Sequence, residues 1–428
     1  MKIFFGILIF VIQVGFAAQA QRICGTTGYT QQLIAGNPSL KSSYKTVEAQ
    51  IAAFTKGSIT ARDTTANEII NIPVVVHILY KSADQNLTDA QIKSQLVVLN
   101  NDFSYLNADK INTPSAFKKV AADTKIRFCL AQVDPQGKRT NGIVRKFTTN
   151  DNFSPEDGMK SAAQGGDDAW DSKRYLNVWV CNLAGRTLGY SSVPGGPANV
   201  DGVVIALDVF GTEGNLRSPF NKGRTATHEV GHWLGLKHIW GDAICGTDEV
   251  DDTPTQQYYN YGCPGFPNIT NCSPDSNGDM FMNYMDFTND GCMNMFTNGQ
   301  KTRMRALFAK NNLRNSFLLS FACDSTLVQG GVLPAKDSVV TVPISAKESF
   351  IVKVYPNPAQ SVVTVEYNGV PTIAIKSVTV FNVLGNKVFT TQLNAEKTTI
   401  NIAHFSKGVY ILRIEGGSNN FTTKIVKE

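Results

Sequence analysis

The residues best suited to chemistry in this chain lie in the stretch HEVGHWLGLKH, which contains His228, His232 and His238 with Glu229 beside the first. Histidines four residues apart share one face of a helix and can chelate one ion. Gly235 can adopt a positive φ, end the helix and return His238 to the same ion. Three neutral imidazoles leave a fourth zinc position for water, on which Glu229 can act as general base. The alternative is a helix end with surface histidines.

The full pattern HExxHxxGxxH is far more specific than HExxH, and it is the signature of the metzincin peptidases, which carry a Met-turn downstream. The segment NYMDFTNDGCMNMFTNGQKTRM at 283–304 resembles the Met-turn region of the pappalysin family. The segments CGTDEVDDTPTQ at 245–256 and GYSSVPGG at 189–196 are similar to that family as well.

This resemblance covers roughly residues 63–323 and implies a metzincin fold with zinc endopeptidase activity. The three histidines would be the zinc ligands, Glu229 the base, and Met285 a hydrophobic floor beneath the metal. Taken alone, a methionine at position 285 is more often core packing. The segment from Leu188 to Val193 would be an edge strand that pairs with an extended substrate.

Two positions depart from the family pattern. Relatives often carry a tyrosine two residues after the methionine, thought to help hold the oxyanion, whereas this chain has Phe287, and Tyr284 is another candidate donor. Relatives that cleave at Lys or Arg place an aspartate just before the Met-turn cysteine, to line the pocket beyond the scissile bond. Here Gly291 holds that place with Asp290 next to it, which argues against a preference for basic residues.

An oxygen-rich cluster follows the histidines, with Asp248, Asp251, Asp252 and Thr253 in DEVDDTP. Hard oxygen ligands at this density suit calcium, and the alternative is a solvated acidic turn. The family resemblance implies a structural calcium ion held by Asp248, the carbonyl of Val250 and Thr253, with Asp251 as a further candidate.

The chain contains eight cysteines, which export makes candidates for disulfides. Cys129 and Cys181 lie on predicted strands, where they pair or remain buried thiols, and Cys323 has no obvious partner. Four further cysteines follow the histidines, and spacing alone allows three pairings of these. The family resemblance implies the pairs Cys245–Cys272 and Cys263–Cys292.

Cys24 stands apart in RICGT, close to the N-terminus. A thiolate can occupy the water position of zinc and keep an enzyme latent, as in the cysteine switch of the family's zymogens. The alternative is one half of an ordinary disulfide. Activation would require cleavage before the strand that begins near Ile72, and Arg62 is a plausible point.

Regular elements must position these groups. IPVVVHILY reads as a buried strand, and Thr88-Asp89-Ala90-Gln91 as a capping box that starts a helix with Ile92, Leu96 and Leu99 on one face. Residues 242–300 are rich in Gly, Asn, Asp, Pro and Cys and are predicted to be irregular. Further strands are predicted at 125–131, 175–182 and 203–207, and a closing helix at 299–311.

A chain of 428 residues with 42% hydrophobic residues predicts two or three globular domains. The charge of +5 without a basic block gives no footprint for nucleic acid. A short apolar run ending in Ala18-Gln19-Ala20 is typical of a signal peptide, with an uncleaved anchor as the alternative. We expect a signal peptide at 1–20, a pro-segment at 21–62, a catalytic domain at 63–323, a linker at 324–347 and a β-sandwich at 348–428.

The last segment has short alternating strands with Gly or Asn turns, typical of a small all-β sandwich. VYPNPAQSVVTVEY and the closing GVYILRI and TTKIVKE resemble the C-terminal sorting domain of the type IX secretion system. This resemblance implies secretion across an outer membrane by that machinery. The alternative is a carbohydrate- or protein-binding sandwich.

The sequence therefore predicts an α+β protein, in which a twisted mixed sheet with helices and an irregular lower half precede an all-β sandwich. We expect a secreted, monomeric zinc metalloendopeptidase that is made as a zymogen and cleaves proteins or peptides, with bound calcium. The alternatives are an inert zinc-containing binding protein at the cell surface, against which the intact Glu229 argues, and a peptidase with one dedicated substrate.

Overall fold

The computed structural model describes residues 21–57, 68–274, 277–320, 322–323, 338–344, 348–368, 375–382, 386–392, 397–416 and 419–428. The expected signal peptide at 1–20 and the expected activation point at Arg62 lie outside the described residues. No helix in the described part of the chain is long and apolar enough to cross a membrane.

The main body of the chain, residues 68–323 as far as they are described, is built on one mixed sheet with the strand order β2-β1-β4-β6-β5, in which β3 also pairs with β1. All pairs are parallel except β5 with β6, so β5 runs antiparallel at the edge. The central strand is buried on both of its faces, as expected for a covered parallel sheet. The strands are β1 (Ile70–Tyr80), β2 (Ile126–Leu130), β3 (Ile143–Phe147), β4 (Leu176–Cys181), β5 (Gly189–Ser191) and β6 (Gly202–Ala206).

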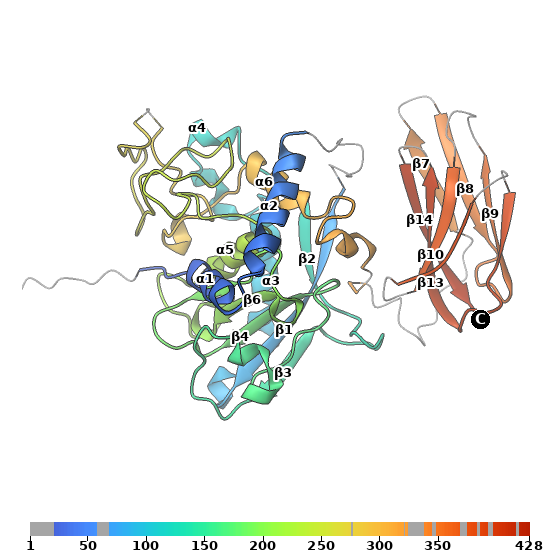
Figure 1. Cartoon of the computed structure of the whole chain (residues 1–428), viewed down its shortest axis with the longest axis horizontal. Coiled ribbons are helices and arrows are strands. Elements are labelled where there is room, and N and C mark those ends of the chain that lie inside the picture. Colours follow the sequence, from blue (N-terminus) through green and yellow to red (C-terminus); the bar gives the residue numbers. More distant parts are fainter. Residues whose placement is uncertain are drawn as a thin grey trace, which may run out of the picture.

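Helices pack on this sheet and on one another (Figure 1). Half of the predicted capping box is present, because the Thr88 side chain accepts a hydrogen bond from the Gln91 amide. The Gln91 side chain donates to the Phe210 carbonyl instead of completing the box. The predicted face of α3 is buried. The predicted closing helix is shorter than expected, because the Asn312 side chain donates to the Ala306 carbonyl and the chain turns there. The helices of the body are α3 (Asp89–Phe103), α4 (Ser115–Lys118), α5 (Arg224–Trp233) and α6 (Asn298–Ala306).

Two helices precede the body, α1 (Thr26–Gly36) and α2 (Leu40–Thr55). We call residues 21–57 the N-terminal segment. Helix α1 packs against β5, and α2 packs against α6 (Figure 1). These two helices were not predicted, although Leu40, Val47 and Ile51 are buried on one face of α2 and their spacing is helical.

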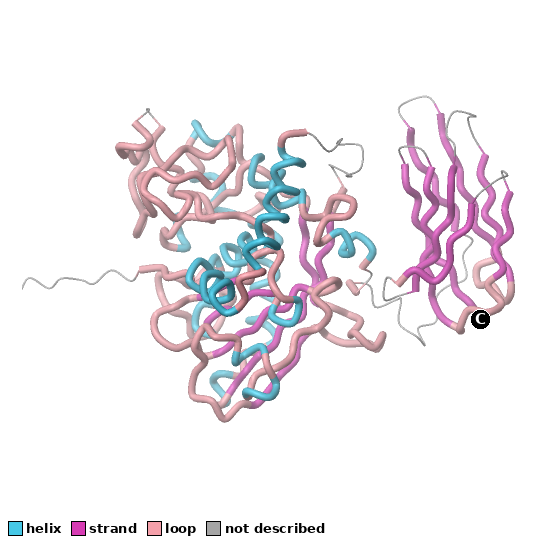
Figure 2. The backbone as a smooth tube through the Cα atoms, viewed as in Figure 1, coloured by secondary structure: helices cyan, strands magenta, loops and turns pink. Residues whose placement is uncertain are grey.

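The loop region, residues 242–320 without 275–276, is mostly irregular as predicted (Figure 2). Disulfides cross-link it at Cys245–Cys272 and Cys263–Cys292, the pairs that the family resemblance implied. A third disulfide joins Cys129 to Cys323, which corrects the expectation that Cys323 lacks a partner. The described free cysteines are Cys24 and Cys181, and the latter is a buried thiol.

The C-terminal segment is an all-β sandwich of two antiparallel sheets with the orders β11-β10-β13-β14 and β12-β9-β8-β7. Strand β7 pairs with β8, so residues 338–344 belong to the sandwich and not to the linker expected at 324–347. The expected α+β class is confirmed. The strands are β7 (Ser338–Ile344), β8 (Glu348–Tyr355), β9 (Val362–Asn368), β10 (Ile375–Asn382), β11 (Lys387–Gln392), β12 (Lys397–Asn401), β13 (Gly408–Gly416) and β14 (Asn419–Lys427).

Candidate active site

The three histidines of the pattern converge on one point. His228 and His232 lie on one face of α5, and the helix ends where Gly235 takes a φ of +86° and turns the chain back. The Nε2 atom of His232 then lies 3.1 Å from Nε2 of His228 and 3.1 Å from Nε2 of His238. All three rings are buried.

The opposite ring nitrogens fix the orientation of these histidines. Nδ1 of His228 is 2.7 Å from the carbonyl oxygen of Tyr284, and Nδ1 of His232 is 2.8 Å from that of Leu236. Nδ1 of His238 lies 2.6 Å from a carboxylate oxygen of Asp242. Because a carbonyl can only accept, each Nδ1 of the first two rings carries its proton, and their Nε2 lone pairs face one another.

Three Nε2 lone pairs at this spacing repel one another, and a divalent cation that all three bind removes this repulsion. Burial lowers the pKa of His228 well below its ordinary value, and burial together with His238 lowers the pKa of His232 to about 3. Neutral imidazoles are the form that binds zinc. The residues present therefore fit a zinc ion.

Glu229 lies beside this cluster and is 1% exposed. Its Oε2 accepts a hydrogen bond of 2.9 Å from Oγ1 of Thr26 and lies 3.4 Å from Sγ of Cys24. Burial raises the pKa of Glu229 to about 7, while the hydrogen bonds from Thr26 and Cys24 lower it. The carboxyl group is thus poised to exchange a proton near neutral pH, but the N-terminal segment occupies it.

Cys24 completes the cluster. The possible ligand atoms of Cys24, His228, His232 and His238 all lie within 4.8 Å of one another, the one such group among the described residues. Burial and the Glu229 carboxylate raise the pKa of the Cys24 thiol in this structure. A cation among the histidines acts in the opposite direction and favours the thiolate.

The backbone around Cys24 is held by the edge of the sheet. The Gly25 amide donates to the Gly189 carbonyl at 2.9 Å, and the Leu188 amide donates to the Ile23 carbonyl at 3.0 Å. The N-terminal segment therefore adds a short parallel bridge to β5. This is the edge at which the sequence analysis expected an extended substrate to pair.

Arg22 was not singled out from the sequence, yet it is buried in the same cleft. Its guanidinium lies 2.5 Å from Oδ1 of Asp290 and donates to Oγ1 of Thr225 at 3.1 Å. The other carboxylate oxygen of Asp290 accepts from the amides of Lys222 and Arg224. Asp290, next to Gly291, is therefore the carboxylate that holds this arginine. The sequence signal for Arg22 was its position two residues before Cys24.

The Met-turn lies under α5. A Cβ built on Gly231 would meet Sδ of Met285 at 2.5 Å, so the methionine lies directly against the helix. The ring of Phe287 packs against His238 at 4.9 Å between centroids. Tyr284 is fully buried beside Asp102 and Arg224, so its hydroxyl is not available to a substrate. Tyr284 instead positions His228 through its carbonyl.

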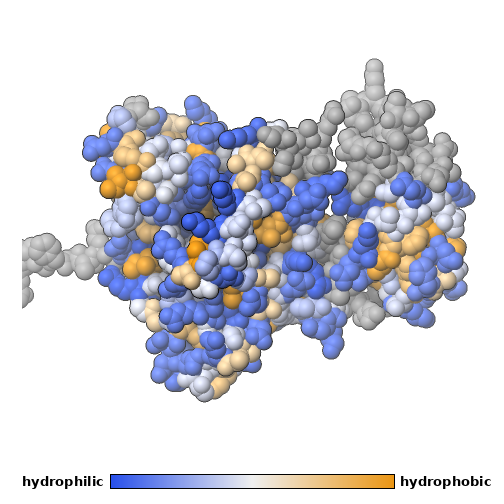
Figure 3. All heavy atoms as spheres, in the orientation of Figure 1, coloured by the Kyte–Doolittle hydropathy of each residue, from blue (hydrophilic) through white to orange (hydrophobic). Residues whose placement is uncertain are grey.

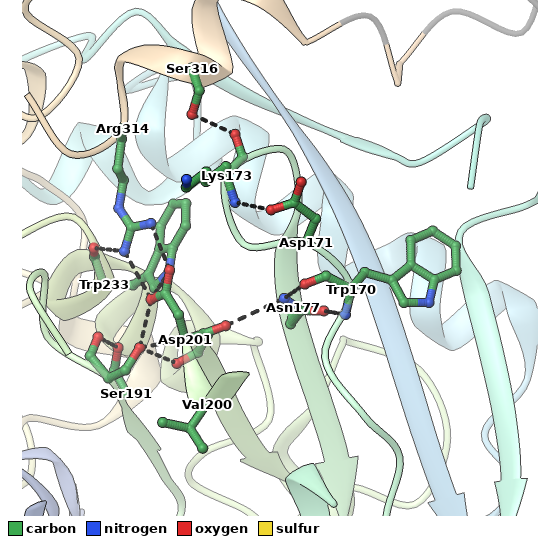
Figure 4. A network of polar contacts seen from close by, with 12 residues as sticks. Trp170, Asp171, Lys173, Asn177, Ser191, Val200, Asp201, Trp233, Arg314 and Ser316 are labelled. Atoms are coloured by element: carbon green, nitrogen blue, oxygen red, sulfur yellow. Dashed lines mark hydrogen bonds and ion pairs between the residues drawn. The ribbon is translucent and has the colours of Figure 1, made fainter. Parts of the chain in front are cut away.

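A buried polar network holds the end of α5 and of β5 in place (Figure 4). Asp201 accepts from Nε1 of Trp233 at 3.0 Å, from Oγ of Ser192 at 2.8 Å and from the guanidinium of Arg314 at 3.0 Å. The Arg314 guanidinium also lies 3.5 Å from the centroid of the Trp233 ring. The helix that carries two histidines and the edge strand of the cleft are thus fixed to each other.

The acidic loop, residues 248–253, brings together only some of the oxygen ligands that the sequence predicted. Oγ1 of Thr253 donates to both carboxylate oxygens of Asp248, at 2.9 and 3.0 Å, and lies 2.8 Å from the Val250 carbonyl. Asp251 is exposed, and Asp252 binds Thr297 and the start of α6 instead. Burial raises the pKa of Asp248 to about 7.

Comparison with known proteins agrees with this geometry. Residues 160–309 match the M43 peptidase family model, described as pregnancy-associated plasma protein-A, and residues 353–428 match the secretion system C-terminal sorting domain. An extracellular metalloprotease of Podospora anserina is 32% identical over 297 residues, which cover 67% of this chain and 88% of the relative.

Solved structures are closer in sequence. Mirolysin in complex with compound 9 is 52% identical with a TM-score of 0.59, covering 60% of this chain and 98% of that one. A mutant of promirolysin from Tannerella forsythia is 47% identical with a TM-score of 0.65, covering 70% of this chain and 98% of that one.

The fold and the histidine cluster define the class as a zinc metalloendopeptidase with a metzincin catalytic domain. The chain belongs to the M43 peptidase family, the pappalysins, and ends in a type IX sorting domain. It is secreted, is made as a zymogen and acts on peptide substrates. The alternative of an inert binding protein is not favoured.

Proposed function

We propose that His228, His232 and His238 hold the catalytic zinc and that Glu229 is the general base. The observation that carries this proposal is the meeting of three Nε2 atoms beside a buried carboxyl group. Zinc, when bound, supplies Lewis acidity toward the scissile carbonyl and the attacking water. Met285 forms the apolar floor of the site.

Glu229 takes the proton of the attacking water and returns it to the leaving amine nitrogen. The backbone of β5 binds the substrate as an added strand, through the Leu188 amide and the Gly189 carbonyl that now bind Ile23 and Gly25. Phe287 offers no hydroxyl donor, so polarisation of the carbonyl rests on the metal.

Asp290 sets the residue that follows the scissile bond. Its buried carboxylate pairs with Arg22 in the same cleft, so a substrate arginine or lysine fits the pocket once the N-terminal segment has left. A preference for basic residues at this position follows.

Cys24 keeps the enzyme latent as the fourth ligand. Its unpaired thiol at the histidines supports this role over that of half a disulfide. Arg22 and the pairing with β5 hold the thiol in place. Cleavage after the N-terminal segment, at a point such as Arg62, then releases the cleft.

The experiment compares the exported chain from residue 21 onward as wild type, Glu229→Gln and Cys24→Ser, with zinc content and casein cleavage measured for each. The expected result is that all three bind zinc, that Cys24→Ser becomes active fastest, and that Glu229→Gln stays inactive after processing. An active Glu229→Gln protein would overturn the assignment of the base.

Calcium binding is proposed at the acidic loop, with Asp248, the Val250 carbonyl and Thr253 as ligands and Asp251 as a flanking charge. The convergence of the first three supports it. Calcium is expected to raise the melting temperature of the wild type and not of Asp248→Asn, by differential scanning fluorimetry in chelated buffer.

The domain limits are proposed as a signal peptide at 1–20, a pro-segment at 21–62, a catalytic domain at 63–323 and a sandwich that starts by residue 338. We also propose that the protein is a monomer. Hydrophilic residues dominate the visible face of the catalytic body in Figure 3, with small separate apolar patches. Light scattering after size-exclusion chromatography tests this directly.

A further inference from the structure

A second buried site lies at the rim of the cleft, where Tyr29 of the N-terminal segment inserts into the catalytic body. Tyr29 is 3% exposed, and its hydroxyl lies 2.7 Å from both carboxylate oxygens of Asp157. The ammonium of Lys160 donates to the same hydroxyl at 3.1 Å. The phenol group thus donates to one charged group and accepts from another.

The aromatic ring of Tyr29 also has close partners in the catalytic body. The ring centroid lies 4.7 Å from that of Tyr190 on β5. The Lys160 ammonium lies 4.5 Å from the centroid of Tyr29 and 4.9 Å from that of Tyr190, within reach of a cation–π contact. Acceptor, donor and aromatic wall together describe a site for a tyrosine side chain.

The walls of this site do not depend on Tyr29. The Lys160 ammonium also binds the Val200 carbonyl at 3.0 Å and Asp157 at 2.8 Å, and the Lys160 amide binds the Asp157 carbonyl at 2.9 Å. The Tyr190 hydroxyl binds Sδ of Met159 at 2.9 Å. These contacts all lie within the catalytic body and remain when the N-terminal segment leaves.

Loss of the N-terminal segment leaves the polar groups of the site short of partners. An ammonium has three donors, and the third donor of Lys160 now goes to Tyr29. Asp157 loses the hydroxyl that both of its oxygens accept. Lys160 keeps its contacts with Asp157 and the Val200 carbonyl, so a substrate phenol would replace water at the third donor and at the Asp157 carboxylate.

The position of the site along the cleft indicates which part of a substrate it meets. Arg22 lies against Asp290, Cys24 pairs in parallel with Gly189 of β5, and Thr26 and Tyr29 contact the next residues of that strand, Ser191 and Tyr190. Since the Asp290 pocket takes the residue after the scissile bond, the Tyr29 site lies on the side that precedes it.

We propose that Asp157, Lys160 and Tyr190 form a subsite of the matured enzyme that binds a tyrosine side chain of the substrate, a few residues before the scissile bond. This rests on the proposed function, in which β5 binds the substrate and Asp290 binds a basic residue. The enzyme then selects substrates by two side chains on opposite sides of the cut, and Tyr29 occupies the second subsite in the zymogen.

The test uses enzyme matured from the full exported chain and quenched fluorescent peptides with Arg directly after the scissile bond. Tyr, Phe or Ala is placed in turn at each of the four positions before that bond. At one position Tyr is expected to exceed Ala in kcat/KM by about 10-fold or more, with Phe between, as for a hydrogen bond to a charged group.

Asp157→Asn and Lys160→Met are expected to bring the Tyr peptide down to about the rate of the Phe peptide, because they remove the partners of the hydroxyl while the ring contact with Tyr190 persists. Lys146→Met, an exposed lysine on β3, is the matched control and keeps the Tyr preference. Circular dichroism of each variant checks folding, and the wild-type peptide series tests the proposal without any variant.

Equal rates for Tyr and Ala at all four positions would overturn the subsite, as would a preference for Tyr over Phe that survives both variants. If the proposed function itself is wrong, no peptide of the series is cleaved after Glu229-dependent maturation, whichever side chain it carries. The two failures are therefore distinguishable.

Discussion

Two regions of the catalytic body meet at the histidines, and they are held together by different means. The sheet region, residues 70–233, relies on parallel ladders and on strands buried on both faces, as in β1 and β4. The loop region relies on buried polar side chains and disulfides. Asp286, for example, accepts from the Asn260 and Phe287 amides and from the side chains of Asn260 and Gln256.

The difference shows what a region without ladders requires. Its backbone amides and carbonyls still need partners when buried, and side chains must supply them. That explains the many Asn, Asp and Gln residues after the helix. The metal site lies on the border, because His228 and His232 belong to α5 whereas His238 and Met285 belong to the segment that follows.

The largest expected effect comes from a change that touches chemistry and not stability. Glu229→Gln on the sheet side is expected to lower kcat/KM by about 10²- to 10⁴-fold, because the general base is lost. Its melting temperature should stay close to that of the wild type. Glu213→Gln, an exposed residue, is the control. If Glu229→Gln keeps activity near the wild-type level, Glu229 is not the general base.

Matched core truncations compare the two regions directly. Leu176→Ala in β4 and Met295→Ala in the loop region each remove a fully buried side chain. Each is expected to lower the free energy of unfolding by about 2–5 kcal/mol, measured by urea denaturation. Only Met295→Ala should also lower kcat/KM, because repacking around the truncated side chain shifts the backbone that bonds to the Tyr284 amide, next to the carbonyl that orients His228. Equal losses of kcat/KM in the two variants would contradict this difference between the sheet region and the loop region.

Disulfide removal gives a smaller contrast. Replacing Cys263 and Cys292 with serine opens a loop with a sequence separation of 29 and is expected to cost about 2–4 kcal/mol of stability. Cleavage of peptides with Arg after the scissile bond should weaken as well, because Asp290 lies two residues from Cys292. The control replaces Cys129 and Cys323, where stability should fall and the Arg preference persist. Loss of the Arg preference in the variant without Cys129 and Cys323 would show that the preference does not depend on the Cys263–Cys292 disulfide in particular.

The smallest effect on catalysis is expected from the sandwich. A matured enzyme that ends at residue 323 should keep kcat/KM within about two-fold, since the described sandwich has its own core. Export through the type IX machinery should fail for the same truncation. A large loss of peptidase activity would show that the tail supports the cleft.

The parts of the fold that the sequence predicted correctly depend on local patterns. The helix start at Thr88, the turn at Gly235 and the strand alternation of the sandwich depend on neighbouring residues, and each was predicted. The helix after Thr297 ended early because a side-chain contact from Asn312 competes with it. The helices of the N-terminal segment were missed, although the spacing of Val47 and Ile51 indicates one of them.

The contacts that were missed join residues far apart in the chain. Cys129 pairs with Cys323 across 194 residues, and Arg22 meets Asp290 across 268. Tyr29 meets Lys160 across 131. No local period or motif encodes such a pair, since its formation depends on the path of the whole chain.

The sequence by itself determined that His228, His232 and His238 meet beside Glu229, because spacing on a helix and around a glycine is a local property. Only the tertiary structure decided which groups fill the cleft. The N-terminal segment places Arg22, Cys24 and Tyr29 against residues of three different elements. Because charged and polar groups removed from water need hydrogen-bond or ion-pair partners, burial makes each of these contacts specific.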